Sequence, residues 1–203
     1  KELTRYRAFV AALTLFSYDS DTYAPEQSFD MTMPFVKTLS EEAFNILNND
    51  YMKALVLLGC PETPSQTPMA VYVFNKLTKM GYDVTIAANP AASKLVKISD
   101  PENLYKLNLV DLERTLGDIN EGDYDLLVGF VHKDAAASFF VTFEQILQCK
   151  SLALVFSRDA DEIEEFVNMI EESGSNAKIT AVRAFHNPSP IKVKFDKAIK
   201  EFE

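Results

Sequence analysis

Residues 54–68 read ALVLLGCPETPSQTP, an apolar run that leads directly into a proline-rich loop. The run Ala54–Leu58 is typical of a strand that is buried on both faces of a parallel sheet. Thr67 and Pro68 then stand in the order expected of a helix N-cap and a first helical proline. We therefore predict a strand followed by a helix over Pro68–Met80, which ends at Gly81.

The same alternation continues toward the C-terminus. We predict further strands at Asp83–Ala88, Leu126–Val131, Leu152–Phe156 and Lys178–Phe185, and further helices at Ala91–Val96, Asp134–Cys149 with Asp134 as N-cap, Ala160–Glu172 and Val193–Phe202. The segment Asn103–Ile119 fits either a strand with a short helix or a mostly helical stretch. Strands separated by single helices run parallel. Residues 52–203 are therefore predicted to form a three-layer, doubly wound, Rossmann-like α/β domain with a mostly parallel sheet of five or six strands.

Residues 1–51 follow a different pattern, with two helical stretches on either side of a polar loop. A segment of about 50 residues rarely closes a core by itself. We therefore expect a helical extension that serves as an arm for docking or dimerisation.

Composition narrows the choice of partners. The 30 acidic and 20 basic residues give a formal net charge of -10, which disfavours nucleic acid and anionic membrane surfaces. No apolar run approaches the roughly 18 residues of a membrane helix. The two cysteines and two histidines form no spaced zinc signature, so we expect no metal site and a reduced, cytoplasmic location.

Ligands of open parallel sheets bind outside the carboxyl ends of the strands, and Cys60 and His132 both follow predicted strands. A thiol beside an imidazole base could act as a nucleophile. Alternatively, Cys60 is a small buried residue that closes a strand, and His132 is a hydrogen-bonded structural residue.

The hydroxyl residues Thr63, Ser65 and Thr67 recur at every second position, a spacing similar to that of the flavodoxin phosphate loop. This spacing predicts a flavin or nucleotide site. The intervening prolines lack amide hydrogens, which favours a stiff loop instead. The first turn has no GxGxxG, so we do not predict NAD binding.

Three further polar residues follow predicted strands and are candidates for binding an anionic ligand: Asn89, Lys133 and Arg158. Arginine can hold a carboxylate or a phosphate with two hydrogen bonds.

The segments GCPETP at residues 59–64 and AANPAA at residues 87–92 resemble an uncharacterised protein family of methanogenic archaea, and the resemblance extends over about residues 52–203. It implies a Rossmann-like fold and a cytoplasmic location, with no assigned activity or cofactor. It also implies an accessory role in the assembly or operation of the enzymes of methanogenesis.

Our leading hypothesis is an accessory protein that binds a small anionic ligand or a protein partner at the strand carboxyl ends, and self-association is expected. The alternatives are an enzyme with a Cys60 nucleophile and a His132 base, and flavin or nucleotide binding at residues 63–67.

Overall fold

The computed structural model describes residues 52–202, and the predicted arm at residues 1–51 lies outside them. The strands are β1 (Lys53–Leu58), β2 (Asp83–Ala88), β3 (Asn108–Asp111), β4 (Leu126–Val131), β5 (Lys150–Ser157) and β6 (Lys178–Arg183). The helices are α3 (Gln66–Met80), α4 (Pro90–Ser99), α5 (Leu112–Asp118), α6 (Asp134–Leu147), α7 (Ala160–Glu172) and α8 (Ser189–Ala198), followed by a 3-10 turn, η1 (Ile199–Phe202). None of these helices is long and apolar enough to span a membrane.

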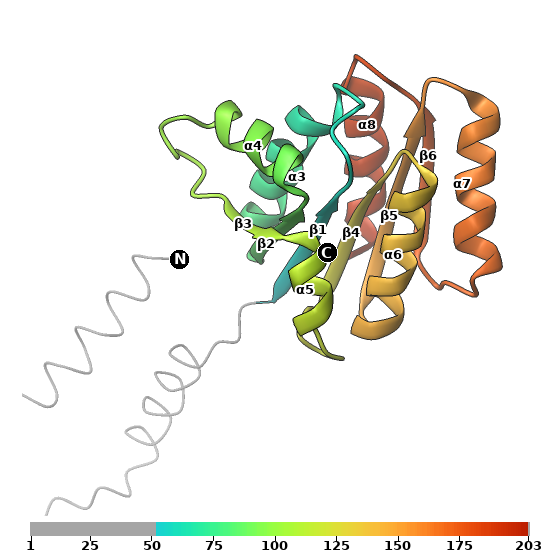
Figure 1. The fold of residues 1–203 in the computed structure, drawn as a ribbon, viewed down its shortest axis with the longest axis horizontal. Helices are drawn as coiled ribbons and strands as arrows, with labels where there is room; N and C mark the ends of the chain where they lie inside the picture. The colour runs from blue at the N-terminus through green and yellow to red at the C-terminus, as the bar shows by residue number, and fades with distance from the viewer. Residues whose placement is uncertain (1–51, 203) are drawn as a thin grey trace, which may run out of the picture. The chain divides into compact units, whose positions relative to one another are not determined.

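The six strands form one parallel sheet in the order β3-β2-β1-β4-β5-β6 (Figure 1). From β1 the chain builds β2 and β3 toward one edge, and it then returns through α5 to begin β4 on the other side of β1. The chain therefore leaves β1 and β4, which are neighbours, in opposite directions. This strand order is that of the doubly wound Rossmann fold, and it confirms the predicted fold class.

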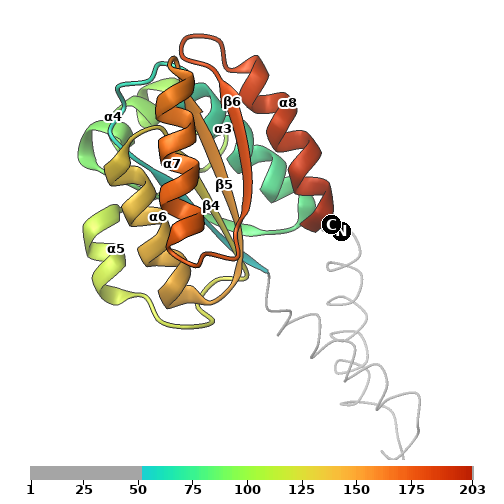
Figure 2. The same ribbon diagram turned by 90° about the vertical axis from the view of Figure 1, so that its right-hand side faces the viewer.

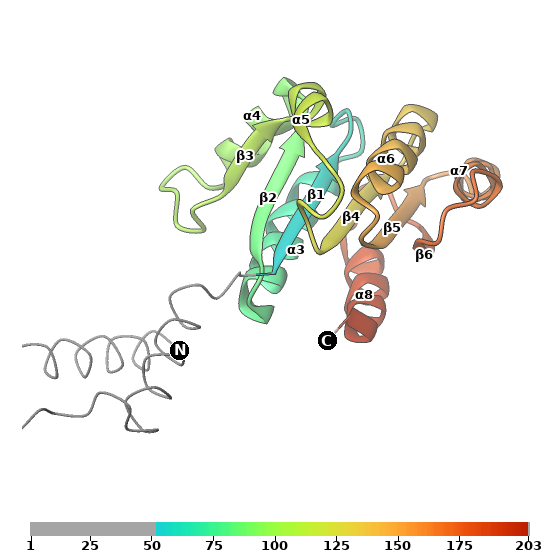
Figure 3. The ribbon, with the colours of Figure 1, turned by 90° about the horizontal axis from the view of Figure 1, so that it is seen from below.

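Helices cover both faces of the sheet, as the views in Figure 2 and Figure 3 show. One face packs against α3, α4 and α8, and the other packs against α5, α6 and α7. Side chains of β1 alternate between the two cores, with Val56 and Leu58 in the first and Leu55 and Leu57 in the second. This alternation follows from the two-residue period of a strand, and it explains why β1 is apolar throughout.

Close packing between β4 and α6 depends on Gly129. A Cβ atom added at Gly129 would lie 2.2 Å from Cδ2 of Phe140, far inside van der Waals contact. The absent side chain lets the fully buried Phe140 ring lie against the strand. Gly129 therefore sets how closely α6 approaches the sheet, beside the point where the two halves of the fold meet.

Two predicted helix caps are wrong. The N-cap of α3 is Ser65, and Thr67 lies inside the helix, because the Gln66 amide already donates to the Thr63 carbonyl at 3.0 Å and starts the first turn. The N-cap of α6 is Lys133, and the side chain of Asp134, its first helical residue, accepts from the Ala135 amide at 2.7 Å.

The ambiguous segment Asn103–Ile119 contains a strand and a short helix, β3 and α5, which confirms the first of the two predicted alternatives. Asp111 allows helix α5 to begin directly after strand β3. Its carboxylate accepts from the Arg114 amide at 2.9 Å and caps α5 immediately after the strand ends. Asn89 caps α4 in the same way, by accepting from the Ala92 amide at 2.8 Å.

Candidate functional site

The loops that follow β1, β2, β3 and β4 meet at the carboxyl edge of the sheet and enclose a cavity of about 440 Å³. Its polar lining consists of Cys60 after β1, Asn89 after β2, Asp111 and Glu113 at the start of α5, and Lys133 before α6. The rest of the wall is backbone or apolar: Leu57, Leu58, Gly59, Pro90, Leu112, Gly129, Phe130, Ala135, Ala136 and Phe139. A volume of roughly 300–1,000 Å³ with a mostly apolar wall and a few polar groups is typical of small-molecule sites.

The position of the cavity follows from the strand order. β1 and β4 are adjacent, but the connections after them lead to opposite faces of the sheet, so a crevice opens between their carboxyl ends. Three of the residues predicted from sequence, Cys60, Asn89 and Lys133, line this cavity together. Cys60 is exposed to solvent, and Asn89 and Lys133 are partly exposed. The structure therefore brings three of the seven polar candidates after the first four strands to one place.

The hydroxyl residues of the β1–α3 loop do not line the cavity. Thr63 and Ser65 are buried, with 5% and 0% of their surfaces exposed, and Thr67 is half-buried in the first turn of α3. The Ser65 amide donates to the Phe185 carbonyl at 3.0 Å, so backbone groups at the start of α3 are bound within the protein. The predicted phosphate contacts at residues 63–67 thus lie apart from the cavity.

Arg158 also lies apart, beyond the end of β5. Its guanidinium carbon stacks 4.2 Å from the centre of the Phe185 ring. Its carbonyl accepts hydrogen bonds from the Arg183 side chain at 3.2 and 3.3 Å. Neither contact brings Arg158 to the cavity, which the first four strands surround.

His132 is buried beneath the β1–α3 loop, with 4% of its surface exposed. Its Nε2 atom lies 2.8 Å from Oε1 of Gln66, and Nε2 of Gln66 donates to the Gly59 carbonyl at 3.3 Å. Since the Gln66 amide nitrogen is used on Gly59, we assign the proton of this imidazole to Nε2, which donates to Gln66. Nδ1 has no hydrogen-bond partner among residues 52–202.

Burial lowers the pKa of His132, because a charged imidazolium is poorly solvated in the protein interior. The ring also stacks near Phe156, with 5.4 Å between the ring centres. The lowered pKa favours the neutral form of the His132 imidazole near pH 7. This residue forms its side-chain hydrogen bond with Gln66, and Cys60 instead faces the cavity.

Lys133 and Glu62 form an ion pair at the mouth of the cavity, between the β1–α3 loop and the start of α6. The bond to Lys133 lowers the pKa of the Glu62 carboxyl, and the same bond raises the pKa of Lys133. Both groups are consequently charged over the physiological pH range. The Glu62 side chain is 55% exposed and the Lys133 side chain is 43% exposed, so solvent reaches the pair freely.

Several residues of this region were not predicted from sequence. Gln66 forms a hydrogen bond and Glu62 forms an ion pair with a residue about 70 positions away in the chain. No local sequence pattern predicts such pairs. Asp111 could have been found, because it ends a strand and directly precedes a helix. The sequence, however, left the segment Asn103–Ile119 open between a strand with a short helix and a mostly helical stretch.

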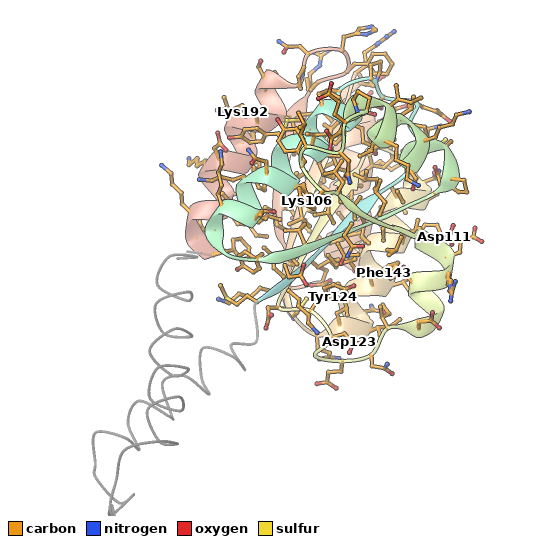
Figure 4. The ribbon with its side chains drawn as sticks, turned by 90° about the vertical axis from the view of Figure 1, so that its left-hand side faces the viewer. Lys106, Asp111, Asp123, Tyr124, Phe143 and Lys192 are labelled. Atoms are coloured by element: carbon orange, nitrogen blue, oxygen red, sulfur yellow. The ribbon has the colours of Figure 1, made fainter. Side chains whose placement is uncertain are left out.

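A larger open groove of about 680 Å³ lies beside α5, next to the amino-terminal ends of β1 and β2 and the carboxyl-terminal residues of β3. Asp111, Asp123 and Tyr124 lie on that side of the molecule, away from Lys192 of α8 (Figure 4). Its charged residues are partly engaged with the protein itself, as in the Arg114–Asp118 pair at 3.7 Å. Because ligands of parallel sheets bind at the carboxyl ends, the smaller cavity is the better candidate.

Within residues 52–202, no group of three or more His, Cys, Asp or Glu side chains is placed to hold a metal ion. The described residues around the cavity therefore provide no preformed set of metal ligands.

Relatives of the chain include an archaeal protein and a protein of known structure. A protein of Methanocaldococcus jannaschii, "Uncharacterized protein MJ0452", is 38% identical over 142 residues, which cover 69% of this chain and 92% of the relative. The solved structure of MT0777 is 50% identical, covers 74% of this chain and 99% of its own, and superposes with a TM-score of 0.71. The fold described above is therefore shared with a protein of known structure.

A more distant likeness is to the FMN-dependent cysteine decarboxylase SpaF, at 13% identity and a TM-score of 0.45 over 72% of this chain and 97% of that chain. At this level the likeness supports no inference about a cofactor or a reaction. The family described as "Domain of unknown function (DUF1890)" matches residues 55–198, which is most of the chain. With this match and its archaeal relative, the chain belongs to the DUF1890 family.

Proposed function

We propose that this protein is an accessory protein that binds a small anionic molecule in the cavity at the carboxyl ends of β1, β2, β3 and β4. The cavity itself carries the proposal. It lies at the point where strand order reverses, and its volume of about 440 Å³ suits a small molecule better than a protein segment. Lys133 supplies a positive charge at the mouth, and the apolar wall supplies contact area.

Direct detection of the bound molecule tests this function. Native mass spectrometry of the protein isolated from its source should show a small mass that is released on mild denaturation. The variant Ala136→Trp places an indole in the cavity, since Ala136 is part of the wall, and should lose that mass. Ala160→Trp adds the same ring at the exposed start of α7 and should retain it. A wild-type chain without ligand, or an Ala136→Trp variant that still carries it, would contradict the proposal.

A second candidate function is covalent chemistry at Cys60, and one observation favours it. The thiol is exposed to solvent and also lines the cavity, so a bound molecule would lie beside it. His132 is a poor choice of base, because its Nε2 atom bonds to Gln66. This function requires a ligand mass that stays on the chain after denaturation and disappears in Cys60→Ser. A ligand released intact from the wild type excludes it.

We leave the loop at residues 63–67 out of the proposed site. Thr63 and Ser65 are buried, and the amide of Gln66 is bonded within the loop. A flavin or nucleotide at that loop would need the buried Thr63 and Ser65 side chains to become accessible and the Gln66 amide to leave the Thr63 carbonyl. The experiment above also tests this alternative, because a flavin would be recognised by its mass.

A further inference from the structure

The cavity has a charge asymmetry that bears on which molecules it accepts. Among residues 52–202, Lys133 is the one basic side chain in its wall, and it comes from the loop before α6. The acids of the wall, Asp111 and Glu113, come from the start of α5. An anionic group is therefore attracted to the α6 end and repelled from the α5 end, which orients any bound anion toward Lys133.

Lys133 is already bonded to a carboxylate that is not part of the cavity wall. Glu62 comes from the β1–α3 loop and pairs with the Lys133 ammonium across the cavity mouth. The two side chains are about half exposed, and exposed ion pairs contribute little net free energy because water competes for both charges. A ligand can therefore replace Glu62 at modest cost.

Glu62 and a ligand anion would compete for the same ammonium. Both are negative, and at contact distance around one cation they would repel each other. Binding of an anion at Lys133 is therefore most favourable when Glu62 leaves or moves away. The surrounding wall, with Phe130, Leu112 and Phe139, then contacts whatever is attached to the anionic group.

We propose that Glu62 occupies the anion-binding position on Lys133 in the free protein, and that the ligand is an organic anion whose single charged group displaces Glu62 while its apolar body fills the cavity. This inference rests on the proposed function. It goes further by assigning Glu62 the role of an internal competitor that selects ligands by charge. A neutral molecule of the same shape gains the apolar contacts only and leaves the Glu62–Lys133 pair intact.

Two fluorescent probes of matched shape test whether a ligand anion displaces Glu62 from Lys133. 1-Anilinonaphthalene-8-sulfonate carries one sulfonate on an aromatic body, and N-phenyl-1-naphthylamine is the same body without the charge. Titration of each probe should be made on the full chain for wild type, Glu62→Gln, Lys133→Gln and the double variant. Ala136→Trp, which fills the cavity, reports whether a probe binds there at all.

We expect Glu62→Gln to bind the sulfonate about two- to fivefold more tightly, which is the range set by exposed ion pairs, and to bind the neutral probe unchanged. Lys133→Gln should weaken binding of the sulfonate and should abolish the gain from Glu62→Gln in the double variant. An equal effect of Glu62→Gln on both probes, or no effect on either, would overturn the proposed displacement of Glu62 by the anion. The cavity would still stand as a binding site. Failure of Ala136→Trp to reduce binding, or no binding of either probe to wild type, would count against the proposed function itself.

Discussion

Nε2 of His132 lies 2.8 Å from Oε1 of Gln66, and this bond joins the end of β4 to the first residue of α3. Gln66 also donates to the carbonyl of Gly59, so a single buried side chain ties together three segments beneath the cavity. The residue thus holds the β1–α3 loop, which carries Cys60 and Glu62, against the sheet.

Replacing Gln66 by Ala should destabilise the protein by about 2–4 kcal/mol, because the buried His132 imidazole and the partly buried Gly59 carbonyl lose their partner. The measurement is the free energy of unfolding in urea at pH 7.5. Gln145→Ala, on the exposed surface of α6, is the matched control and should change stability by no more than about 0.5 kcal/mol. Equal effects of the two substitutions would show that the bond to His132 contributes nothing.

The buried His132 predicts a loss of stability in mild acid. Burial places the pKa of His132 below its ordinary value of 6.5 in the folded chain, whereas the unfolded chain titrates near that value. Below pH 6.5 the unfolded state therefore binds more protons, and the free energy of unfolding falls as pH decreases, by up to about 1.4 kcal/mol per pH unit.

This pH dependence is measured by unfolding between pH 7.5 and 5.5, above the range in which carboxylates titrate. His132→Gln should flatten the dependence, and His186→Gln, at an exposed position, should preserve it. The pH dependence does not come from His132 if His132→Gln retains the full slope over this range.

The two cysteines should differ sharply in reactivity. Burial raises the pKa of the Cys149 thiol to about 11, whereas Cys60 is exposed at the cavity. Because the thiolate is the reactive form, iodoacetamide at pH 8 should modify the folded protein once, at Cys60. Mass spectrometry of the intact chain counts the labels, and Cys60→Ser should remain unlabelled until the protein is unfolded. Labelling of folded Cys60→Ser would mean that Cys149 is accessible.

Gly129 is the most sensitive glycine of the described region. Gly129→Ala places a methyl group 2.2 Å from the Phe140 ring and should cost about 1–3 kcal/mol through overpacking. Gly117→Ala is its control, because the added Cβ meets nothing within 4 Å apart from its chain neighbours and the backbone of its own helix, and it should be neutral or stabilising by up to about 1 kcal/mol. Thermal unfolding of the two variants measures the difference. A tolerated Gly129→Ala would imply that α6 can move away from the sheet.

Part of the candidate site was predictable from the sequence. Cys60, Asn89 and Lys133 follow apolar strand-like runs, and residues in that position gather at one edge of a parallel sheet whatever the details of packing. Thr63, Ser65 and Thr67 satisfied the same rule and yet lie apart from the cavity. Their hydroxyls follow β1 like Cys60, but α3 begins earlier than predicted and carries the loop into the interior.

The amino-acid sequence by itself determined the layered α/β fold, because the strands of this domain are apolar along their length and its helices are amphipathic, and these periodicities are local properties of the chain. The position of the cavity, the pairing of Glu62 with Lys133 and the bond between Gln66 and His132 were decided only in the tertiary structure. Each depends on strand order and on contacts between residues far apart in sequence. Such contacts are selected by the packing of the whole core, and they leave no periodic signal in the chain.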